Sequence, residues 1–310
     1  MNLSPNFLGL QLRNPLVLAS GILGTTGASL ATVAKSGAGA VTSKSVWKQR
    51  HEGHPNPTVL ALGNGNLINA VGIPHGGIEE AEIEFENLRQ LSDVPLFASI
   101  AGAQIEEYVE TTRAITELKP DLIELNISCP NVDDEFGEPL AHNAKLTEKV
   151  TSLAKKACGE IPLTVKLSPN VADISEIARA VEAAGADAIT AINTVGPGLV
   201  IDIETAQPIL ANRFGGLSGP SIRPLAIKAI FEIFEAVKIP IIGTGGITNA
   251  RDALEMIEAG ATLVGIGAAV ADKGAEIFGE IACEIEKWCE SHGITEISEL
   301  VGTAHKNSQL

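Results

Sequence analysis

The stretch PIIGTGGITNARDALEMIEAGATLVGIG, residues 240–267, carries the pattern that decides the fold. Two short apolar runs within it, Pro240–Gly243 and Leu263–Ile266, have the composition of strands that are buried on both faces. Between them, apolar residues repeat at the spacing of one helix face and precede a glycine in the C-cap position: Ala250, Ala253, Leu254 and Ile257, then Gly260. The stretch therefore predicts a strand–helix–strand unit of a parallel sheet.

The same alternation extends over most of the chain. Six earlier apolar runs have the same character: Leu16–Ser20, Ala40–Ser45, Pro95–Ile100, Leu122–Ile127, Pro162–Leu167 and Ala186–Ile192. Helical patterns separate them, and Asp173 is the expected N-cap of one helix. Eight strands that alternate with helices predict a (β/α)8 TIM barrel, with residues 1–310 as one domain. An open doubly wound sheet would show the same periodicity and is the alternative.

Three segments are too long for ordinary loops between a strand and the next helix. They are Trp47–Gly77, Pro130–Asn143 and Val195–Pro220, and each follows a predicted strand. In a barrel, such insertions lie at the C-terminal face, where active sites are built. We therefore expect the functional site at this face.

Composition restricts the classes of partner. The chain has 310 residues, a formal charge of −16 and a hydrophobic fraction of 45%, which argues against nucleic acid or anionic membrane as partners. The four cysteines have no C-x-x-C spacing and the histidines no metal-ligand spacing, so we expect neither a metal site nor a disulfide framework. Residues 1–10 show no signal peptide, and no apolar run is long enough to cross a bilayer. A cytoplasmic protein is expected.

Two glycine-rich segments follow the last two predicted strands. Gly243–Gly246 comes after the seventh strand, and Gly265–Gly267 comes after the eighth. Glycine lets backbone N–H groups approach a phosphate closely, and barrels commonly bind phosphate at these two strands. Such a site needs no net positive charge, which suits an acidic chain. The alternative is that these glycines only form tight turns.

Two lysines interrupt apolar strands near the predicted mouth. Lys44 ends the second strand and Lys166 ends the fifth. Because an isolated buried ammonium is costly, each should reach the mouth or find an anionic partner. We interpret both as anion- or cofactor-binding residues; the alternative is that each extends to solvent.

The segment NISCPN, residues 126–131, places two amides around a thiol at the end of the fourth strand. Amides both donate and accept hydrogen bonds, which suits a planar ring with amide edges. Cys129 could act as a general base, although a buried structural cysteine is the commoner case. Asn69 and the pair Asn193-Thr194 add polar groups at other predicted loops.

Taken in order, these motifs resemble the class 1 dihydroorotate dehydrogenases nearly from end to end. The most specific piece is ELNISCPN, residues 124–131, and NPLVLASG, residues 14–21, begins the match. The other matching segments follow in family order: Ser43–Ser45, Asn69–Ile73, Val165–Leu167, Ile192–Thr194, Gly216–Gly219 and Gly243–Ile247. The resemblance implies a barrel that oxidises dihydroorotate to orotate in pyrimidine biosynthesis.

The resemblance also implies residue roles. Cys129 would remove the C5 proton while hydride passes from C6 to N5 of one FMN per chain. The substrate-binding set would be Lys44, Asn69, Val71, Gly72, Ile73, Asn126, Asn131, Asn193 and Thr194. The FMN-binding set would be Ala19, Ser20, Gly21, Lys44, Ser45, Ser99, Asn126, Lys166, Ile192, Ser218, Gly219, Gly245, Gly246, Gly267 and Ala268.

Cysteine at position 129 is similar to the class 1 enzymes, because its counterpart in the class 2 enzymes is serine. Class 2 enzymes also carry an N-terminal extension, for which we expect no room in residues 1–10. Within class 1 the chain looks more like the 1B type. That type implies a homodimeric core within a heterotetramer, whose second subunit carries FAD and a 2Fe–2S cluster and passes electrons to NAD+. The 1A type, a homodimer that uses fumarate, is the alternative.

Two other functions share some of these features. A flavin barrel similar to dihydropyrimidine dehydrogenase would act on uracil or thymine, which lack the carboxylate of orotate. A non-catalytic flavin- or phosphate-binding module would need neither the thiol nor the lysines and amides at one mouth.

Overall fold

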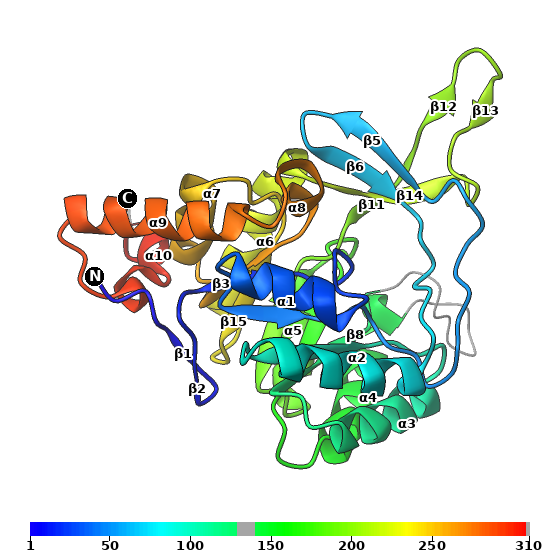
Figure 1. Cartoon of the computed structure of the whole chain (residues 1–310), viewed down its shortest axis with the longest axis horizontal. Coiled ribbons are helices and arrows are strands. Elements are labelled where there is room, and N and C mark those ends of the chain that lie inside the picture. Colours follow the sequence, from blue (N-terminus) through cyan, green and yellow to red (C-terminus); the bar gives the residue numbers. More distant parts are fainter. Residues whose placement is uncertain (129–139, 308–310) are drawn as a thin grey trace.

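The computed structural model describes residues 1–128 and 140–307. Its centre is a closed barrel of parallel strands in the order β10-β15-β16-β3-β4-β7-β8-β9 (Figure 1). The strands are β3 (Leu16–Leu18), β4 (Ala40–Thr42), β7 (Leu96–Ile100), β8 (Leu122–Asn126), β9 (Leu163–Leu167), β10 (Ala188–Ala191), β15 (Ile241–Thr244) and β16 (Leu263–Ile266). This closure confirms the predicted barrel and excludes the open doubly wound sheet.

Helices form the outer layer and pack against one another in chain order. They are α1 (Gly27–Lys35), α2 (Ile78–Leu91), α3 (Ile105–Glu117), α4 (Ala144–Ala157), α5 (Ile174–Ala183), α6 (Arg223–Ala236), α7 (Ala250–Glu258) and α9 (Ile277–Ser291). Their buried faces follow the apolar periodicity, and Asp173 caps α5 as predicted by accepting from the N–H groups of Ser175 and Glu176. The C-terminus adds α8 (Ala268–Lys273) and α10 (Thr303–Asn307).

A short hairpin closes the N-terminal end of the barrel. Strands β1 (Asn6–Phe7) and β2 (Leu10–Gln11) pair antiparallel. Phe7 and Leu12, both almost fully buried, pack in one cluster with inward-facing strand residues such as Phe97 and Leu122. An apolar plug therefore fills one end of the barrel and leaves the C-terminal end for polar side chains.

The sequence pattern predicted no strands within the three long insertions, but two of these insertions contain strands. The insertion Trp47–Gly77 contains β5 (Val59–Gly63) and β6 (Asn66–Asn69). The insertion Val195–Pro220 contains β11 (Val195–Leu199), β12 (Ile201–Asp202), β13 (Gln207–Pro208) and β14 (Phe214–Ser218). They combine into one antiparallel sheet, β11-β14-β6-β5, beside the mouth of the barrel. The hairpin β12–β13 extends furthest from the barrel (Figure 1).

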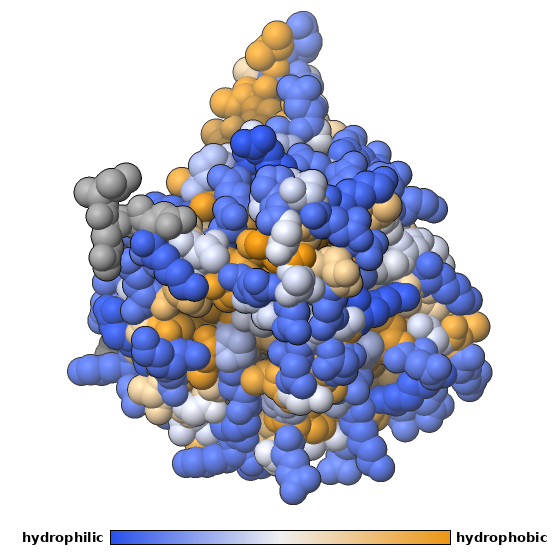
Figure 2. All heavy atoms as spheres, turned by 90° about the vertical axis from the view of Figure 1, so that its left-hand side faces the viewer, coloured by the Kyte–Doolittle hydropathy of each residue, from blue (hydrophilic) through white to orange (hydrophobic). Residues whose placement is uncertain are grey.

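Apolar side chains are exposed on this projection. Figure 2 shows them gathered at the top of the molecule, and Leu199, Ile201 and Ile203 are among the exposed large hydrophobic residues there. Within the described residues, none of the helices has the length and apolarity required to span a bilayer.

Candidate active site

A cavity of about 500 Å³ lies at the C-terminal ends of the barrel strands, beneath the antiparallel sheet. This volume is typical of a site for a small ligand or a cofactor. Strands β3 and β4 end earlier than predicted, at Leu18 and Thr42, and the residues that follow them turn into the cavity wall. The site is therefore built where the strands give way to loops.

Most of the predicted site residues line this one cavity. They are Ala19, Ser20, Gly21, Lys44, Ser45, Asn69, Val71, Gly72, Ile73, Asn126, Lys166, Ile192, Asn193, Thr194, Ser218, Gly219, Gly245, Gly246, Gly267 and Ala268. Ser99 does not line it: its side chain is fully buried behind the wall, with its hydroxyl 2.9 Å from that of Ser45. Cys129 and Asn131 lie outside the described residues.

A chain of hydrogen bonds joins polar side chains from the ends of three strands, β10, β8 and β4. The Asn193 amide donates to the Ser128 hydroxyl over 2.7 Å, and this hydroxyl donates to Oδ1 of Asn126 over 2.6 Å. Nδ2 of Asn126 donates in turn to Ser45 over 3.1 Å. Because both amide ends of Asn126 are occupied, its orientation is fixed before any ligand binds.

Several cavity residues were not among the predicted set. Ser128 connects the two asparagines, and its place inside NISCPN was a signal. Asn170 follows β9 and donates to the carbonyl of Thr194, so the occurrence of asparagine after strands could have identified it. His54 lies in the first insertion and contacts Gly72 closely, a long-range packing relation that no local pattern reveals.

Lys166 places a buried ammonium group at the cavity wall. Its side chain is only 5% exposed and borders the cavity. Within residues 1–128 and 140–307, no hydrogen bond or ion pair reaches its ammonium group. A buried ammonium without a partner is costly, so this position favours a ligand with an acceptor atom. Lys44 lines the same cavity and is half-buried.

The glycine loops form a close-packed cradle at the other end of the cavity. Gly245 and Gly246 have φ angles of 140° and 76°, which side chains rarely adopt. A Cβ on Gly246 would lie 2.8 Å from the backbone nitrogen of Arg223, at the start of α6. The loop is held from behind by Asp252, which accepts from Thr248 and pairs with Arg223. Its backbone is therefore fixed against the cavity.

The loop that contains Val71–Ile73 is held in an unusual conformation. Ile73 has a φ of 50°, which is strained for a β-branched residue. The indole N–H of Trp47 donates to the Ile73 carbonyl over 2.9 Å, and the Trp47 ring stacks on His51. These contacts fix a loop that borders the same cavity as Lys44.

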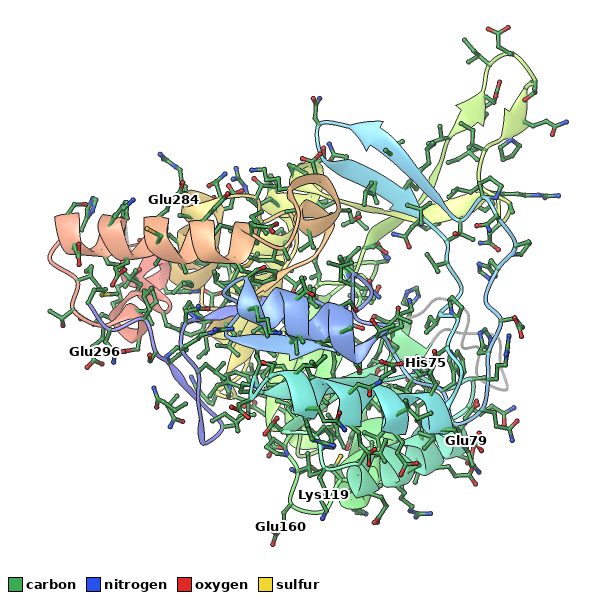
Figure 3. All side chains as sticks on the ribbon, in the orientation of Figure 1. His75, Glu79, Lys119, Glu160, Glu284 and Glu296 are labelled. Carbon is green, nitrogen blue, oxygen red and sulfur yellow. The ribbon has the colours of Figure 1, made fainter. Side chains whose placement is uncertain are left out.

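His75 lies buried just before α2, where Figure 3 labels it. Its Nδ1 accepts from the N–H of Gly77 over 3.0 Å. Burial lowers the pKa of His75 below 6.5; the nearby Glu80 carboxylate opposes this effect, and the positive charge of Lys44 adds to it. The imidazole is therefore neutral in the folded protein at neutral pH.

This pKa predicts a pH-dependent stability. An unfolded histidine takes up a proton as the pH falls through about 6.5, whereas folded His75 resists it, so the unfolded state gains protons and stability decreases. We expect the urea midpoint to fall between about pH 7.5 and about pH 5.5, and to fall less in His75→Asn. Equal pH dependence in both proteins would contradict this assignment.

The model of the dihydroorotate dehydrogenase family matches residues 2–288. The chain belongs to this family. It is 45% identical over 303 residues to a Methanosarcina mazei protein named dihydroorotate dehydrogenase B (NAD(+)), catalytic subunit, covering 96% of this chain and 94% of the relative. Proteins of the same name from Methanothermobacter thermautotrophicus and a Geobacillus species are 40% and 42% identical, covering 98% and 97% of this chain and 98% and 95% of theirs.

Membership of the dihydroorotate dehydrogenase family implies FMN as the cofactor, and the cavity fits it. Lys166 supplies a buried donor that has no partner among residues 1–128 and 140–307. Gly267 borders the cavity at the start of α8, and an added Cβ there would meet only Ala19, at 3.6 Å. An open glycine position of this kind leaves room for a phosphate, which the Gly245 and Gly246 backbone would face.

Gly267 therefore permits a test of the cradle. Gly267→Leu is expected to weaken FMN binding roughly 10- to 100-fold, because the position has room for a Cβ and the added side chain would take space in the cavity that the phosphate needs. Ala271→Leu is the control, since it places a leucine side chain on the exposed side of α8. The measurement is FMN affinity by fluorescence titration. Equal affinity in the two variants would place the phosphate elsewhere.

Proposed function

We propose that this chain is the catalytic subunit of an NAD+-linked dihydroorotate dehydrogenase, which oxidises dihydroorotate to orotate in pyrimidine biosynthesis. The observation that carries the proposal is the gathering of two lysines and an oriented amide network in one cavity of a barrel from this family. The lysines suit the negative charge of such a substrate, and the amides suit its planar ring. The charges are local, which matters in a chain of net charge −16.

The cavity residues have distinct roles in this proposal. Lys44 binds the substrate carboxylate, and Asn69, Asn126 and Asn193 hold the amide edges of the pyrimidine ring. The loop Val71–Ile73 covers the carboxylate end. At the opposite end, Gly219, Gly245, Gly246 and Gly267 hold the FMN phosphate, and Lys166 donates to the flavin ring. Asn131 is assigned to the substrate by family resemblance.

The chemistry requires removal of a proton and a hydride from adjacent carbons. Bound FMN supplies the two-electron acceptor for the C6 hydride. Cys129, as a thiolate, takes the C5 proton, so the C5–H electron pair forms the new C5–C6 double bond. The fixed Asn126 and Asn193 amides would hold the pyrimidine ring in one orientation during both transfers.

The partner proposal follows from the names of the relatives. The words "catalytic subunit" and "NAD(+)" in those names support a second subunit that passes electrons to NAD+, and we propose that it carries FAD and a 2Fe–2S cluster. We also propose that two copies of this chain form the core of a heterotetramer. Copurification of a flavin- and iron-containing subunit with the tagged chain from its own cells would support this assembly, and the chain isolated alone from such cells would contradict it.

The function is tested by turnover of the FMN-loaded chain with an artificial dye as electron acceptor. Dihydroorotate should be converted to orotate, and dihydrouracil should be a poor substrate because it has no carboxylate for Lys44. Preferred oxidation of dihydrouracil would identify a dihydropyrimidine dehydrogenase instead. No turnover of either compound would favour a non-catalytic module.

A further inference from the structure

Tyr108 is the one tyrosine of the chain, and its side chain is fully buried in the first turns of α3. Its hydroxyl donates to the backbone carbonyl of Asn126 over 2.9 Å. Asn126 is the last residue of β8 and lines the cavity, whereas Tyr108 does not. Among residues 1–128 and 140–307, Tyr108 therefore contacts the site through the main chain of Asn126.

This bond completes the fixation of Asn126. Ser128 and Ser45 already occupy the two ends of its side-chain amide, over 2.6 Å and 3.1 Å. The Tyr108 hydroxyl fixes the main chain from the opposite direction, from the helix layer outside the barrel. An amide that must meet a ring edge correctly depends on the position of both its side chain and its backbone.

The surroundings of Tyr108 hold the phenol ring in place. A Cβ on Gly102 would lie 2.8 Å from the Tyr108 nitrogen and 3.1 Å from its ring, so only glycine lets the loop before α3 pass this closely. One turn later, the Thr112 hydroxyl donates to the Tyr108 carbonyl over 2.7 Å, a bond within α3 that involves the Tyr108 backbone and not its phenol group. Phenylalanine would fill the same apolar space, so packing alone does not require the hydroxyl.

We propose that Tyr108 is a positioning residue that sets the Asn126 amide for the substrate ring. The inference rests on the proposed function, in which Asn126 contacts the pyrimidine. Loss of the hydroxyl leaves a buried carbonyl without this donor and frees the end of β8 to shift. Such a shift moves the Asn126 amide relative to the ring.

The test compares Tyr108→Phe with Thr112→Val in the FMN-loaded protein. Both remove one buried hydroxyl from α3 that donates to a backbone carbonyl, but only the first bond reaches β8. In Tyr108→Phe we expect the orotate dissociation constant to rise about fivefold and flavin reduction by dihydroorotate to slow about tenfold. Thr112→Val should change both less than about twofold, while FMN content stays constant.

Coupling to Ser128 separates positioning from general loss of stability. Because Tyr108 and Ser128 both hold Asn126, the loss of orotate affinity in the double variant should differ from the product of the losses in Tyr108→Phe and Ser128→Ala. The pair Thr112→Val and Ser128→Ala should be multiplicative. Equal orotate affinity in Tyr108→Phe and Thr112→Val, or multiplicative effects in both pairs, would overturn the inference. If dihydroorotate fails to reduce the unmodified protein, the proposed function fails instead.

Discussion

Replacement of Cys129 by alanine is expected to leave FMN bound and to slow flavin reduction by dihydroorotate about 1,000-fold at neutral pH. The reason is that the C5 proton then has no acceptor, while the glycine cradle and Lys166 remain. Cys129→Ser should also be slow, because a hydroxyl is a far weaker base than a thiolate. Anaerobic stopped-flow mixing with dihydroorotate measures the rate.

The pH dependence gives a second readout of the same role. A free thiol has a pKa of about 8.5, so reduction of the unmodified protein should accelerate as the pH rises toward this value. The profile should flatten in Cys129→Ala. Cys283→Ala is the control, since Cys283 is an exposed thiol on α9. Burial raises the pKa of Cys158 to about 12, which removes it as a source of this titration. Unchanged kinetics in Cys129→Ala would exclude Cys129 as the base.

Lys44→Met is expected to weaken orotate binding about thirtyfold while changing uracil binding less than about twofold. Orotate and uracil share a pyrimidine ring but differ in the carboxylate, so the difference isolates the contact with the ammonium group. Lys44 and the Val71–Ile73 loop line the same cavity.

Lys48→Met is the matched control for this experiment. Lys48 lies on the same segment but outside the cavity, where it pairs with Glu110 of α3 over 2.8 Å. Its removal should leave the affinities for both ligands unchanged. Equal weakening of orotate and uracil in Lys44→Met would show that Lys44 supports the pocket without recognising the carboxylate.

The eight barrel strands were predictable because each is a continuous apolar run between helical patterns. Leu263–Ile266 was predicted with its observed bounds. Ala40–Ser45 was predicted too long, because β4 ends at Thr42 and Lys44 and Ser45 belong to the cavity wall. Such patterns are local, so they survive without knowledge of the tertiary structure.

The antiparallel sheet was missed for a different reason. Its strands β6 and β14 pair across 147 residues of sequence, as between Asn69 and Gly216, and no local pattern specifies such a partner. The sequence pair Asn64-Gly65 between β5 and β6 is nevertheless a typical hairpin signal, since asparagine and glycine tolerate the positive φ angles of such a turn. Both residues adopt positive φ angles in the structure.

The candidate site shows the same division. Residues at strand ends, such as Lys166 and Asn193, were predictable because a barrel brings those ends together. Ser99 was predicted to line the cavity but lies behind its wall, where its hydroxyl contacts that of Ser45, the residue that borders the cavity. Tyr108 and His54 act through contacts between distant segments, so their place depends on the folded structure. The roles of Cys129 and Asn131 stay predictions.

The most direct test of the account is the visible spectrum of the purified protein under anaerobic conditions, before and after addition of dihydroorotate. We predict a flavin absorption band that bleaches on addition, which would establish cofactor and substrate together. A flavin band that dihydroorotate leaves unchanged would contradict the proposed substrate. No flavin band even after FMN is supplied would contradict the assignment of the cavity.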